Sequence, residues 1–307
     1  MRANLALWVL APALLHLTGC DIEDFAGGRY NQDFHYSYPL KAGGKVSIET
    51  FNGAIDLDGW DQNSVDISGT KYGPSQEAAA ALRVDVDNNP DAIEVRVIRP
   101  TDFHGSRGAR FTIRMPRTAL LDHITSSNGA ISVMGGSGPS RFRTSNGSIH
   151  VQAFEGNLDA RTSNGSIELI DLAGEVMAHT SNARIRAEDL KGPLDAGTSN
   201  GGITATLSQV SRPVRLETSN AGVDLTLPPN FASGVRVTTS NGHITLHMPG
   251  QVNAQVVAHT NNASITSDFD VKVQGALNKN HLDGTIGAGG PLIELGTSNS
   301  PIRLLRM

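Results

Sequence analysis

Carboxylates are the first groups in this sequence to test for chemistry, because hydrolysis of a glycosidic bond needs two of them about 5–9.5 Å apart. Two acid pairs lie close together in the sequence: Glu168 with Asp171, and Glu188 with Asp189. Adjacent side chains tend to diverge, and each pair falls where the chain is expected to turn. We therefore expect solvated turn acids, and the sequence predicts no catalytic residues.

Histidines are the second group to test, because neutral imidazole is a common metal ligand. His179 and His259 each precede a recurring threonine, whereas His150 and His243 flank recurring isoleucines. His243 and His247 are four residues apart, and in an extended strand this even separation puts them on one face without bringing them together. Three ligands cannot be assembled, so the sequence predicts surface histidines and no metal site.

Two further motifs do not match a known ligand-binding pattern. Asp56, Asp58 and Asp61 lack the spacing and the final Glu of a calcium loop. The glycine-rich stretch 284–290 is not followed by a helix or a Lys-Ser/Thr pair, so it is no nucleotide-binding loop. The net charge of −5 with scattered Lys and Arg gives no basic stripe. We expect no cofactor and no nucleic-acid partner.

The element that must position all these groups is a short repeated phrase. Thr-Ser-Asn begins at Thr144, Thr162, Thr180, Thr198, Thr218, Thr239 and Thr297, with near copies at 126–128 and 260–262. The central asparagines are Asn128, Asn146, Asn164, Asn182, Asn200, Asn220, Asn241, Asn262 and Asn299. The first four steps are each 18 residues, and the later ones are 20, 21, 21 and 37. A fixed period of this length indicates a repeat architecture.

The residues around each phrase alternate as strands do. Leu158, Ala160 and Thr162 share one parity, and Ile167 and Leu169 share the other, so the phase changes at Asn164-Gly165. The recurring apolar position predicts a core of one residue per unit. Its members are Ile131, Ile149, Ile167, Ile185, Ile203, Val223, Ile244, Ile265 and Ile302.

Two architectures fit this pattern. Asn-Gly between alternating runs is a strong hairpin signal. The alternative is a parallel β-solenoid, in which each Asn lies about 4.8 Å from its equivalent in the previous coil. Stacked amides can hydrogen-bond along such a ladder, which gives a reason for the identical residues. Arg143 would then lie over Arg161, at some cost. We favour the solenoid and a structural role for the asparagine ladder, with any ligand contacting variable positions such as Arg161 and Glu168, or residues 70–110.

The N-terminus has the pattern of a processing segment. An apolar run from Leu5 to Leu17 precedes Leu17-Thr18-Gly19-Cys20. This resembles the lipobox of bacterial lipoproteins, which implies lipid attachment at Cys20, the chain's one cysteine. Residues 1–19 are then a lipoprotein signal peptide and 20–33 a tether. We expect an extracytoplasmic protein on a lipid tether, and Asp21 resembles an inner-membrane retention signal.

The remaining chain divides into two predicted regions. Residues 34–120 read as a β-rich capping region with one short helix N-capped by Ser75. Residues 121–307 read as an all-β solenoid of 18–21-residue repeats, a single-stranded parallel β-helix. A near copy of the phrase, Phe51-Asn52-Gly53-Ala54-Ile55, precedes the solenoid.

The lipobox-like segment, this near copy and the serial Thr-Ser-Asn-Gly-x-Ile copies together resemble the bacterial putative-adhesin β-strand-repeat family, over roughly residues 43–307. The resemblance implies right-handed β-helical coils and an envelope-anchored protein, and it brings no catalytic residues. We expect a binding, scaffolding or adhesin-like role, with the membrane and an envelope glycan or protein as partners. A glycan-active β-helix enzyme and an accessory protein in envelope-stress signalling remain as alternatives.

Overall fold

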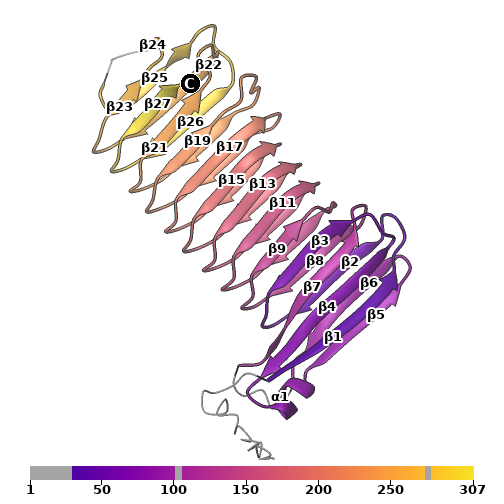
Figure 1. Cartoon of the computed structure of the whole chain (residues 1–307). Coiled ribbons are helices and arrows are strands. Elements are labelled where there is room, and N and C mark those ends of the chain that lie inside the picture. Colours follow the sequence, from indigo (N-terminus) through magenta and orange to yellow (C-terminus); the bar gives the residue numbers. More distant parts are fainter. Residues whose placement is uncertain (1–29, 101–105, 274–277) are drawn as a thin grey trace, which may run out of the picture.

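The structure, a computed structural model, describes residues 30–100, 106–273 and 278–307. It is an elongated stack of strands in which the N-terminal and C-terminal parts of the chain lie at opposite ends (Figure 1). Two long sheets face each other, with 13 and 14 strands. Cys20, the signal segment 1–19 and the first part of the tether lie outside the described residues.

The strands of the first sheet, in spatial order, are β1 (Tyr30–Pro39), β4 (Ser64–Gly73), β7 (Gly108–Pro116), β3 (Ile55–Trp60), β9 (Ile131–Met134), β11 (Ile149–Glu155), β13 (Ile167–Ala173), β15 (Ile185–Lys191), β17 (Ile203–Gln209), β19 (Val223–Thr226), β21 (Ile244–Met248), β27 (Ile302–Arg306) and β23 (Ile265–Ser267).

The second sheet, from the C-terminal end of the stack, contains β24 (Val271–Val273), β25 (His281–Ile286), β22 (Ala254–Thr260), β26 (Leu292–Thr297), β20 (Val235–Thr238), β18 (Val214–Glu217), β16 (Leu194–Gly197), β14 (Val176–His179), β12 (Leu158–Arg161), β10 (Ser140–Arg143), β8 (Leu120–Ser126), β2 (Lys45–Thr50), β6 (Ala92–Ile98) and β5 (Arg83–Asn89).

Each repeat forms one coil with a strand in each sheet. β12 pairs in parallel with β14 so that Leu158 lies beside Val176, and β11 pairs in parallel with β13 so that Ile149 lies beside Ile167. Both offsets are the 18-residue step of the sequence. The parallel register confirms the β-solenoid and excludes the hairpin alternative.

The core lies between the two sheets and follows the alternation of the sequence. Leu158, Ala160, Ile167 and Leu169 are each at most 1% exposed. Of the nine predicted core positions only Ile265 departs, being half-buried, because β23 is the outermost strand of its sheet. Burial of each such side chain contributes on the order of 1.5–3 kcal/mol, which is how a chain with few aromatics stabilises the stack.

The N-terminal end differs from the predicted division. Residues 30–33, expected in the tether, begin β1, which pairs antiparallel with β4. β2 and β3 already belong to the stack, because they pair in parallel with β8 and β9. The solenoid therefore includes coils that precede residue 121.

The N-terminal end of the stack is closed by antiparallel strands and one helix. β4 pairs with β7, and β5 with β6, both antiparallel. The helix α1 (Gln76–Ala80) is capped as expected, since the backbone N–H of Ala78 donates to Ser75 Oγ at 3.1 Å. In the described part of the chain no helix has the length and apolar character needed to cross a bilayer.

The C-terminal end departs from sequence order. The coil β26–β27 lies between the coil β20–β21 and the coil β22–β23, although it follows both in the sequence. The expectation that Asn262 stacks on Asn241 is therefore wrong: Asn299 lies between them. Repeat copies offer the same hydrogen-bonding groups, so sequence alone does not determine which copies become neighbours.

Candidate functional site

One edge of the solenoid is built from the Thr-Ser-Asn bends, and we name it the asparagine edge. The Asn164 side-chain amide donates to Asn146 Oδ1 at 2.7 Å, and Asn182 donates to Asn164 Oδ1 at 2.7 Å. The same bond joins successive asparagines from Asn128 to Asn241 and continues through Asn299 to Asn262. Asn128 also donates to Asn52, so the near copy at residue 52 belongs to the ladder.

The buried threonine of each phrase fastens the bend to the coil before it. Thr162 Oγ1 donates to the Gly147 carbonyl at 2.9 Å and accepts the Gly165 N–H at 3.3 Å. A Cβ at Gly165 would lie 1.7 Å from the Gly147 oxygen, so this bend as it stands has room only for glycine, whereas the equivalent position is alanine at Ala183, Ala221 and Ala263. Thr, Asn and Gly of the phrase thus each have a structural task.

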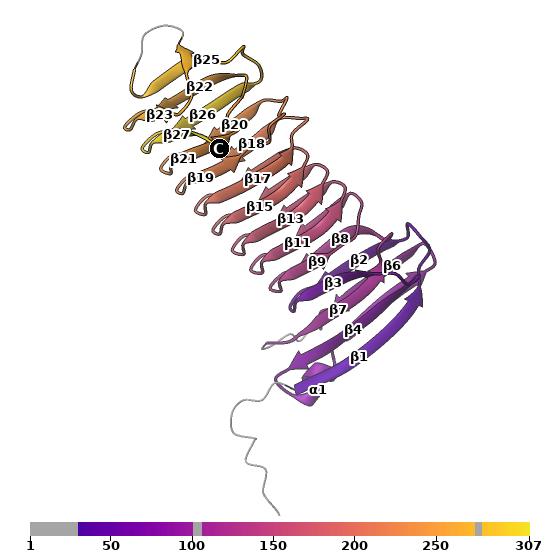
Figure 2. The ribbon, with the colours of Figure 1, turned by 45° about the horizontal axis from the view of Figure 1, so that its top comes forward.

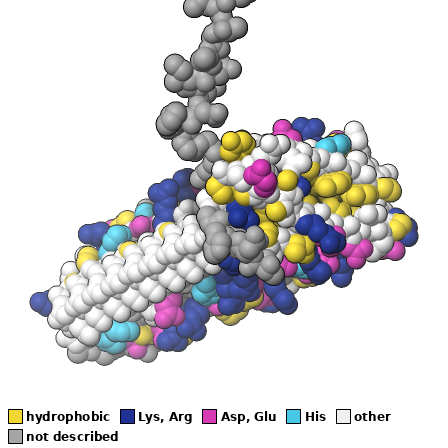
Figure 3. Space-filling model, turned by 90° about the horizontal axis from the view of Figure 1, so that it is seen from below, with side chains coloured by type: hydrophobic (Ala, Val, Ile, Leu, Met, Phe, Trp, Pro, Cys, Tyr) yellow, Lys and Arg dark blue, Asp and Glu magenta, His cyan; other side chains and the backbone are white. Residues whose placement is uncertain are grey.

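The surface of the asparagine edge is uncharged. Figure 3 shows a long strip along the stack whose side chains are neither charged nor hydrophobic. Ser163 and Asn164 are exposed there, as are their equivalents in the neighbouring coils. Since each ladder amide already uses one N–H and its oxygen, the strip offers ligands only weak, uniform polar contacts.

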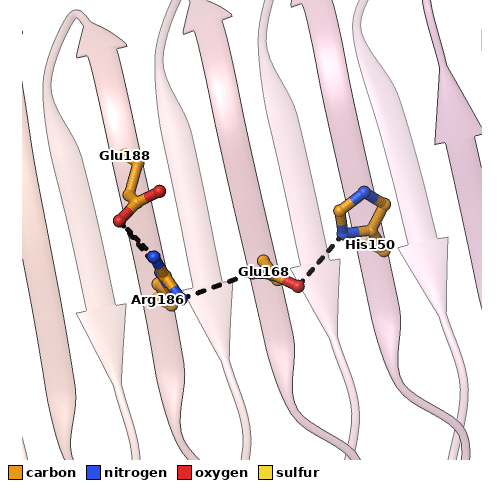
Figure 4. Close-up of polar contacts among 4 residues, drawn as sticks. All are labelled: His150, Glu168, Arg186 and Glu188. Atoms are coloured by element: carbon orange, nitrogen blue, oxygen red, sulfur yellow. Dashed lines mark hydrogen bonds and ion pairs between the residues drawn. The ribbon is translucent and has the colours of Figure 1, made fainter.

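The outer face of the first sheet carries charged side chains instead. His150 Nδ1 lies 3.3 Å from Glu168, and Arg186 lies 3.9 Å from Glu168 and 2.6 Å from Glu188 (Figure 4). The hydrogen bond with Glu188 raises the pKa of Arg186 above its ordinary value. His150, Glu168 and Arg186 belong to three successive strands, so their contacts cross between coils, whereas Glu188 bonds Arg186 within β15.

The two candidate carboxylate pairs do not converge. Glu168 contacts His150 and Arg186, whereas Asp171 accepts a 2.9 Å hydrogen bond from Lys191. This bond raises the pKa of Lys191 above its ordinary value. In the other pair, Glu188 bonds Arg186 and Asp189 accepts from Ser208. Within each pair the two acids contact different residues, which is not the arrangement of a catalytic pair.

A backbone feature explains two of these acids. Asp171 and Asp189 have φ of 53° and 56°, and Ala153, one coil earlier, has φ of 54°. The left-handed region favours Asp and Asn among non-glycine residues. The three positions recur at the 18-residue step, so each marks an outward bulge of its strand. Their spacing was visible in the sequence, but an alanine at the first position hid the signal.

The histidines have separate surroundings. His179 Nε2 lies 3.7 Å from Asp195, and His243 Nε2 lies 3.6 Å from Asp224, in different sheets. His259, in β22, lies against Gly296 of the neighbouring strand β26. Across residues 30–100, 106–273 and 278–307 no group of three His, Cys, Asp or Glu side chains is arranged to hold a metal ion.

The aspartates of β3 and the turn after it also have separate surroundings. Asp61 accepts a 3.0 Å hydrogen bond from Arg117. Asp56 and Asp58 alternate outward along β3. Partial burial raises the pKa of Asp56, and the charge of Asp58 raises it further. These positions form a charged strand face and give no sign of a calcium loop.

The stacked arginines have a shared counter-ion. Arg143 lies beside Arg161 in the parallel register. The Asp159 carboxylate accepts from both guanidinium groups, at 2.8 Å from Arg161 Nε. Arg161, an expected ligand contact, is therefore engaged within the fold.

A large hollow lies elsewhere, near the C-terminal end, and we name it the distal hollow. Its volume is about 840 Å³, within the range of ligand sites. Three irregular corners form it, at residues 229–232, 250–253 and 286–291, together with Phe269, Asp270 and Arg306. The Arg306 guanidinium carbon lies 5.1 Å from the centroid of the Phe269 ring. The repeat pattern of the sequence gives no sign that these segments meet.

A smaller hollow adjoins the region expected to bind ligands. About 490 Å³ lie between Tyr72 and Arg110 on one side and Asn52 and Asn128 on the other. The distal hollow is larger and combines amide, acidic, basic and aromatic side chains. It is the stronger candidate for a binding site.

Comparison with known proteins adds two distant structural likenesses. No protein-family model and no curated protein matches this sequence. A crystal structure of a "putative cell adhesion protein" from Clostridium sporogenes is 11% identical, covers 90% of this chain and 100% of its own, and has a TM-score of 0.24. That of a "putative adhesin" from Bacteroides fragilis is 12% identical, covers 89% and 97%, and has a TM-score of 0.40. Neither likeness decides what this chain binds.

Proposed function

We propose that this protein is a lipid-anchored β-solenoid of the cell envelope that binds a partner at its distal end, in an adhesin-like or scaffolding role. The observation that carries the proposal is that the N-terminal part of the chain and the distal hollow lie at opposite ends of the stack. The described chain begins at β1, ten residues after Cys20, and Figure 2 shows β1 and the strands β22 to β27 at opposite ends of the stack. The residues that line the distal hollow belong to corners beside these last strands.

The dimensions support a spacer between anchor and ligand. The first sheet has 13 strands, and at about 4.8 Å per strand it is roughly 58 Å long. From β7 to β23 the strands of this sheet pair in parallel without interruption, and this pairing and the shared core make the stack stiff along its length. Acyl chains at Cys20 would hold one end at a bilayer, since several chains together anchor a protein stably. The other end would then stand away from the membrane.

The distribution of charged groups favours binding over catalysis. Carboxylates on the sheet faces contact basic side chains of neighbouring coils, as Glu168 does Arg186 and Asp171 does Lys191. The distal hollow instead combines Asn230 and Gln251 with Asp270 and Arg306. Amides with one charge of each sign suit a polar ligand such as an envelope glycan or the surface of an envelope protein.

The anchor is tested by replacing Cys20. In the native host the unchanged chain is expected in the membrane fraction and to take up a labelled fatty acid. Cys20→Ala should release the chain from membranes and abolish labelling. Asp21→Ser, which keeps the cysteine, is the matched control and separates inner-membrane retention from attachment. Membrane recovery of Cys20→Ala equal to that of the unchanged chain would refute lipid anchoring.

The distal site is tested by capture from envelope extracts. The intact lipidated protein, Gln251→Glu and Gln209→Glu are each used as bait. Gln251 lines the distal hollow, whereas Gln209 is an exposed glutamine at the end of β17, outside it. A specific glycan or protein should be lost with Gln251→Glu and kept with Gln209→Glu. Equal capture by all three baits would remove the distal hollow from the proposal.

A further inference from the structure

The position of β26–β27 carries an inference about self-association. In Figures 1 and 2 the yellow β26 and β27 lie among orange strands that precede them in the sequence. Val235 and Val256 both have Ile293 as their parallel partner, one on each side. The coil β26–β27 thus fills a slot between two coils that precede it in the sequence.

The slot is closed by the same hydrogen bonds on both sides. Thr297 Oγ1 donates to the Gly242 carbonyl at 3.0 Å, and Thr260 Oγ1 donates to the Ser300 carbonyl at 3.0 Å. Asn299 donates to Asn241 at 2.6 Å and accepts from Asn262 at 2.6 Å. All of these are the repeat's own contacts. Any coil with this phrase in this register can form them, whichever molecule supplies it.

The connection to the slot is flexible in composition. Residues 287–291 are Gly-Ala-Gly-Gly-Pro, and they are the sole link between β25 and β26. Gly287 and Gly289 have φ of 61° and 80°. Glycines in these conformations have no side chain to hold the linker in one path. The linker can therefore redirect the coil without strain in either strand.

The outer wall of the slot is thin on one side, at β23. β23 has three residues, and its Ile265 is half-buried. End segments with few buried contacts open most readily. The inserted coil itself is firmly packed, since Ile293, Leu295 and Ile302 are fully buried. Opening is therefore slow, but an incoming coil restores every contact that was lost.

We propose that the slot between β20–β21 and β22–β23 exchanges its coil with a second copy of this chain, so that β26–β27 of each molecule fills the slot of the other. Identical contacts are made in the closed and exchanged forms, which is the condition under which domain swapping has a low cost. Exchange then depends on concentration. The binding partner at the distal end is another molecule of the same protein.

This inference deepens the proposed function. With both chains anchored through Cys20, exchange at the far end would join molecules that stand on opposing surfaces. That placement rests on the proposed anchor, whereas exchange itself does not. The test below uses chains carrying Cys20→Ser, so a failure of lipid anchoring leaves its outcome unchanged.

The experiment detects a bond that only exchange can form. Arg236 and Glu294 are parallel partners in β20 and β26, with side chains 3.3 Å apart. Adjacent strands hold Cα atoms at about 4.8 Å, which suits a disulfide. One chain carries Arg236→Cys and the other Glu294→Cys. They are incubated together just below the unfolding temperature and then oxidised, and cross-chain disulfides are read on a non-reducing gel over time.

The matched control uses a pair in the middle of the stack. Asp195 and Arg215 are parallel partners in β16 and β18 and are similarly exposed. Neither coil can leave without unfolding its neighbours on both sides. A mixture of Asp195→Cys and Arg215→Cys chains should therefore give no cross-chain disulfide, while the Arg236→Cys and Glu294→Cys mixture should give a dimer that grows with time and concentration.

A single chain with both Arg236→Cys and Glu294→Cys completes the design. Its internal disulfide should lock the coil and abolish self-association, and reduction should restore it. Closure of this disulfide without any dimer in the mixed chains would overturn the proposal. So would equal dimer in both mixtures, which would reflect random collision. Failure of the internal disulfide to close would mean that β26 does not lie beside β20, and the proposal would fall.

Discussion

The two edges of the solenoid obey different rules. At the asparagine edge the connection from the second sheet to the first has five residues in coil after coil, as in 144–148, 162–166 and 180–184. At the opposite edge, which we name the variable edge, the connection has two residues at 156–157 but four at 210–213 and eight at 227–234. The longer steps of the repeat arise at this second edge.

The hydrogen bonds account for the difference. At the asparagine edge, side chains and backbone of each bend contact the bend before it, as Thr162 does through Gly147 and Asn164 through Asn146. An extra residue would displace all of these groups together. At the variable edge, far fewer side chains cross between coils; Asn157, which accepts the Glu175 N–H at 3.2 Å, is one. The first edge therefore sets the register, and the second can grow loops that form the distal hollow.

Insertion should separate the edges most sharply. Gly-Ser placed between Asn164 and Gly165 breaks several hydrogen bonds of one bend, and with about 1–3 kcal/mol for each buried group left unpaired, we expect a loss of roughly 4 kcal/mol or more. The same insertion between Gly192 and Pro193 only lengthens a loop and should cost less than about 1 kcal/mol. Urea unfolding of both variants measures this. Similar losses would show that the edges do not differ.

A methyl group added at a glycine should also destabilise the asparagine edge more than the variable edge. In Gly165→Ala the new carbon would meet the Gly147 oxygen at 1.7 Å, so the backbone must shift to a path that admits alanine, as at Ala183, and we expect about 1–3 kcal/mol of destabilisation. At the variable edge, Gly234→Ala meets its nearest atom, the Leu292 oxygen, at 3.4 Å and should change stability by less than about 0.5 kcal/mol. Thermal unfolding compares the pair. A tolerated Gly165→Ala would contradict the close approach of the bends.

The asparagine edge was predictable because its chemistry repeats. An unvarying step of 18 residues with identical Thr, Ser and Asn has one economical explanation, namely that each copy bonds the next. The buried faces followed from parity, as with Leu158 and Ile167. Even the near copy at Asn52 was recognisable, although 76 residues separate it from Asn128, to which it is bonded.

Spatial order was not predictable, and the cause is the same identity of the copies. Asn241 can bond Asn262 or Asn299 equally well, so sequence cannot say which one becomes its neighbour. The distal hollow depends on that choice, because the inserted coil brings residues 286–291 beside 229–232 and 250–253. β1 was missed for another reason: Tyr30–Asp33 are exposed on both faces of an edge strand and show no alternation.

Removal of a single amide tests the ladder without disturbing the backbone. Asn164→Ala removes two exposed hydrogen bonds, to Asn146 and from Asn182, and at about 0.5–1.5 kcal/mol each should cost roughly 1–3 kcal/mol. Its counterpart at the variable edge, Asn157→Ala, removes one bond and should cost about half as much. Hydrogen exchange should show weakened protection in the coils on both sides of Asn164. A change confined to its own bend would mean that the ladder does not couple coils.

A substitution on the sheet face between the two edges should change the stability least, and its effect should depend on pH. The pKa of Asp56 is raised above 3.8 by burial and by Asp58. As pH rises, the unfolded chain loses this proton before the folded one does, so the group's contribution to stability falls through pH 3.8 and stays lost once both states are ionised. Asp56→Asn removes this penalty and should stabilise the protein at pH 7 by less than about 0.5 kcal/mol, the scale of exposed sites. The gain should vanish below pH 3.8, which unfolding at pH 7 and pH 3 can verify. If Asp56→Asn instead destabilised the protein at pH 7, the ionised carboxylate would have a favourable partner in the folded state. The outer face of β3 would then be held by side-chain bonds, as the asparagine edge is.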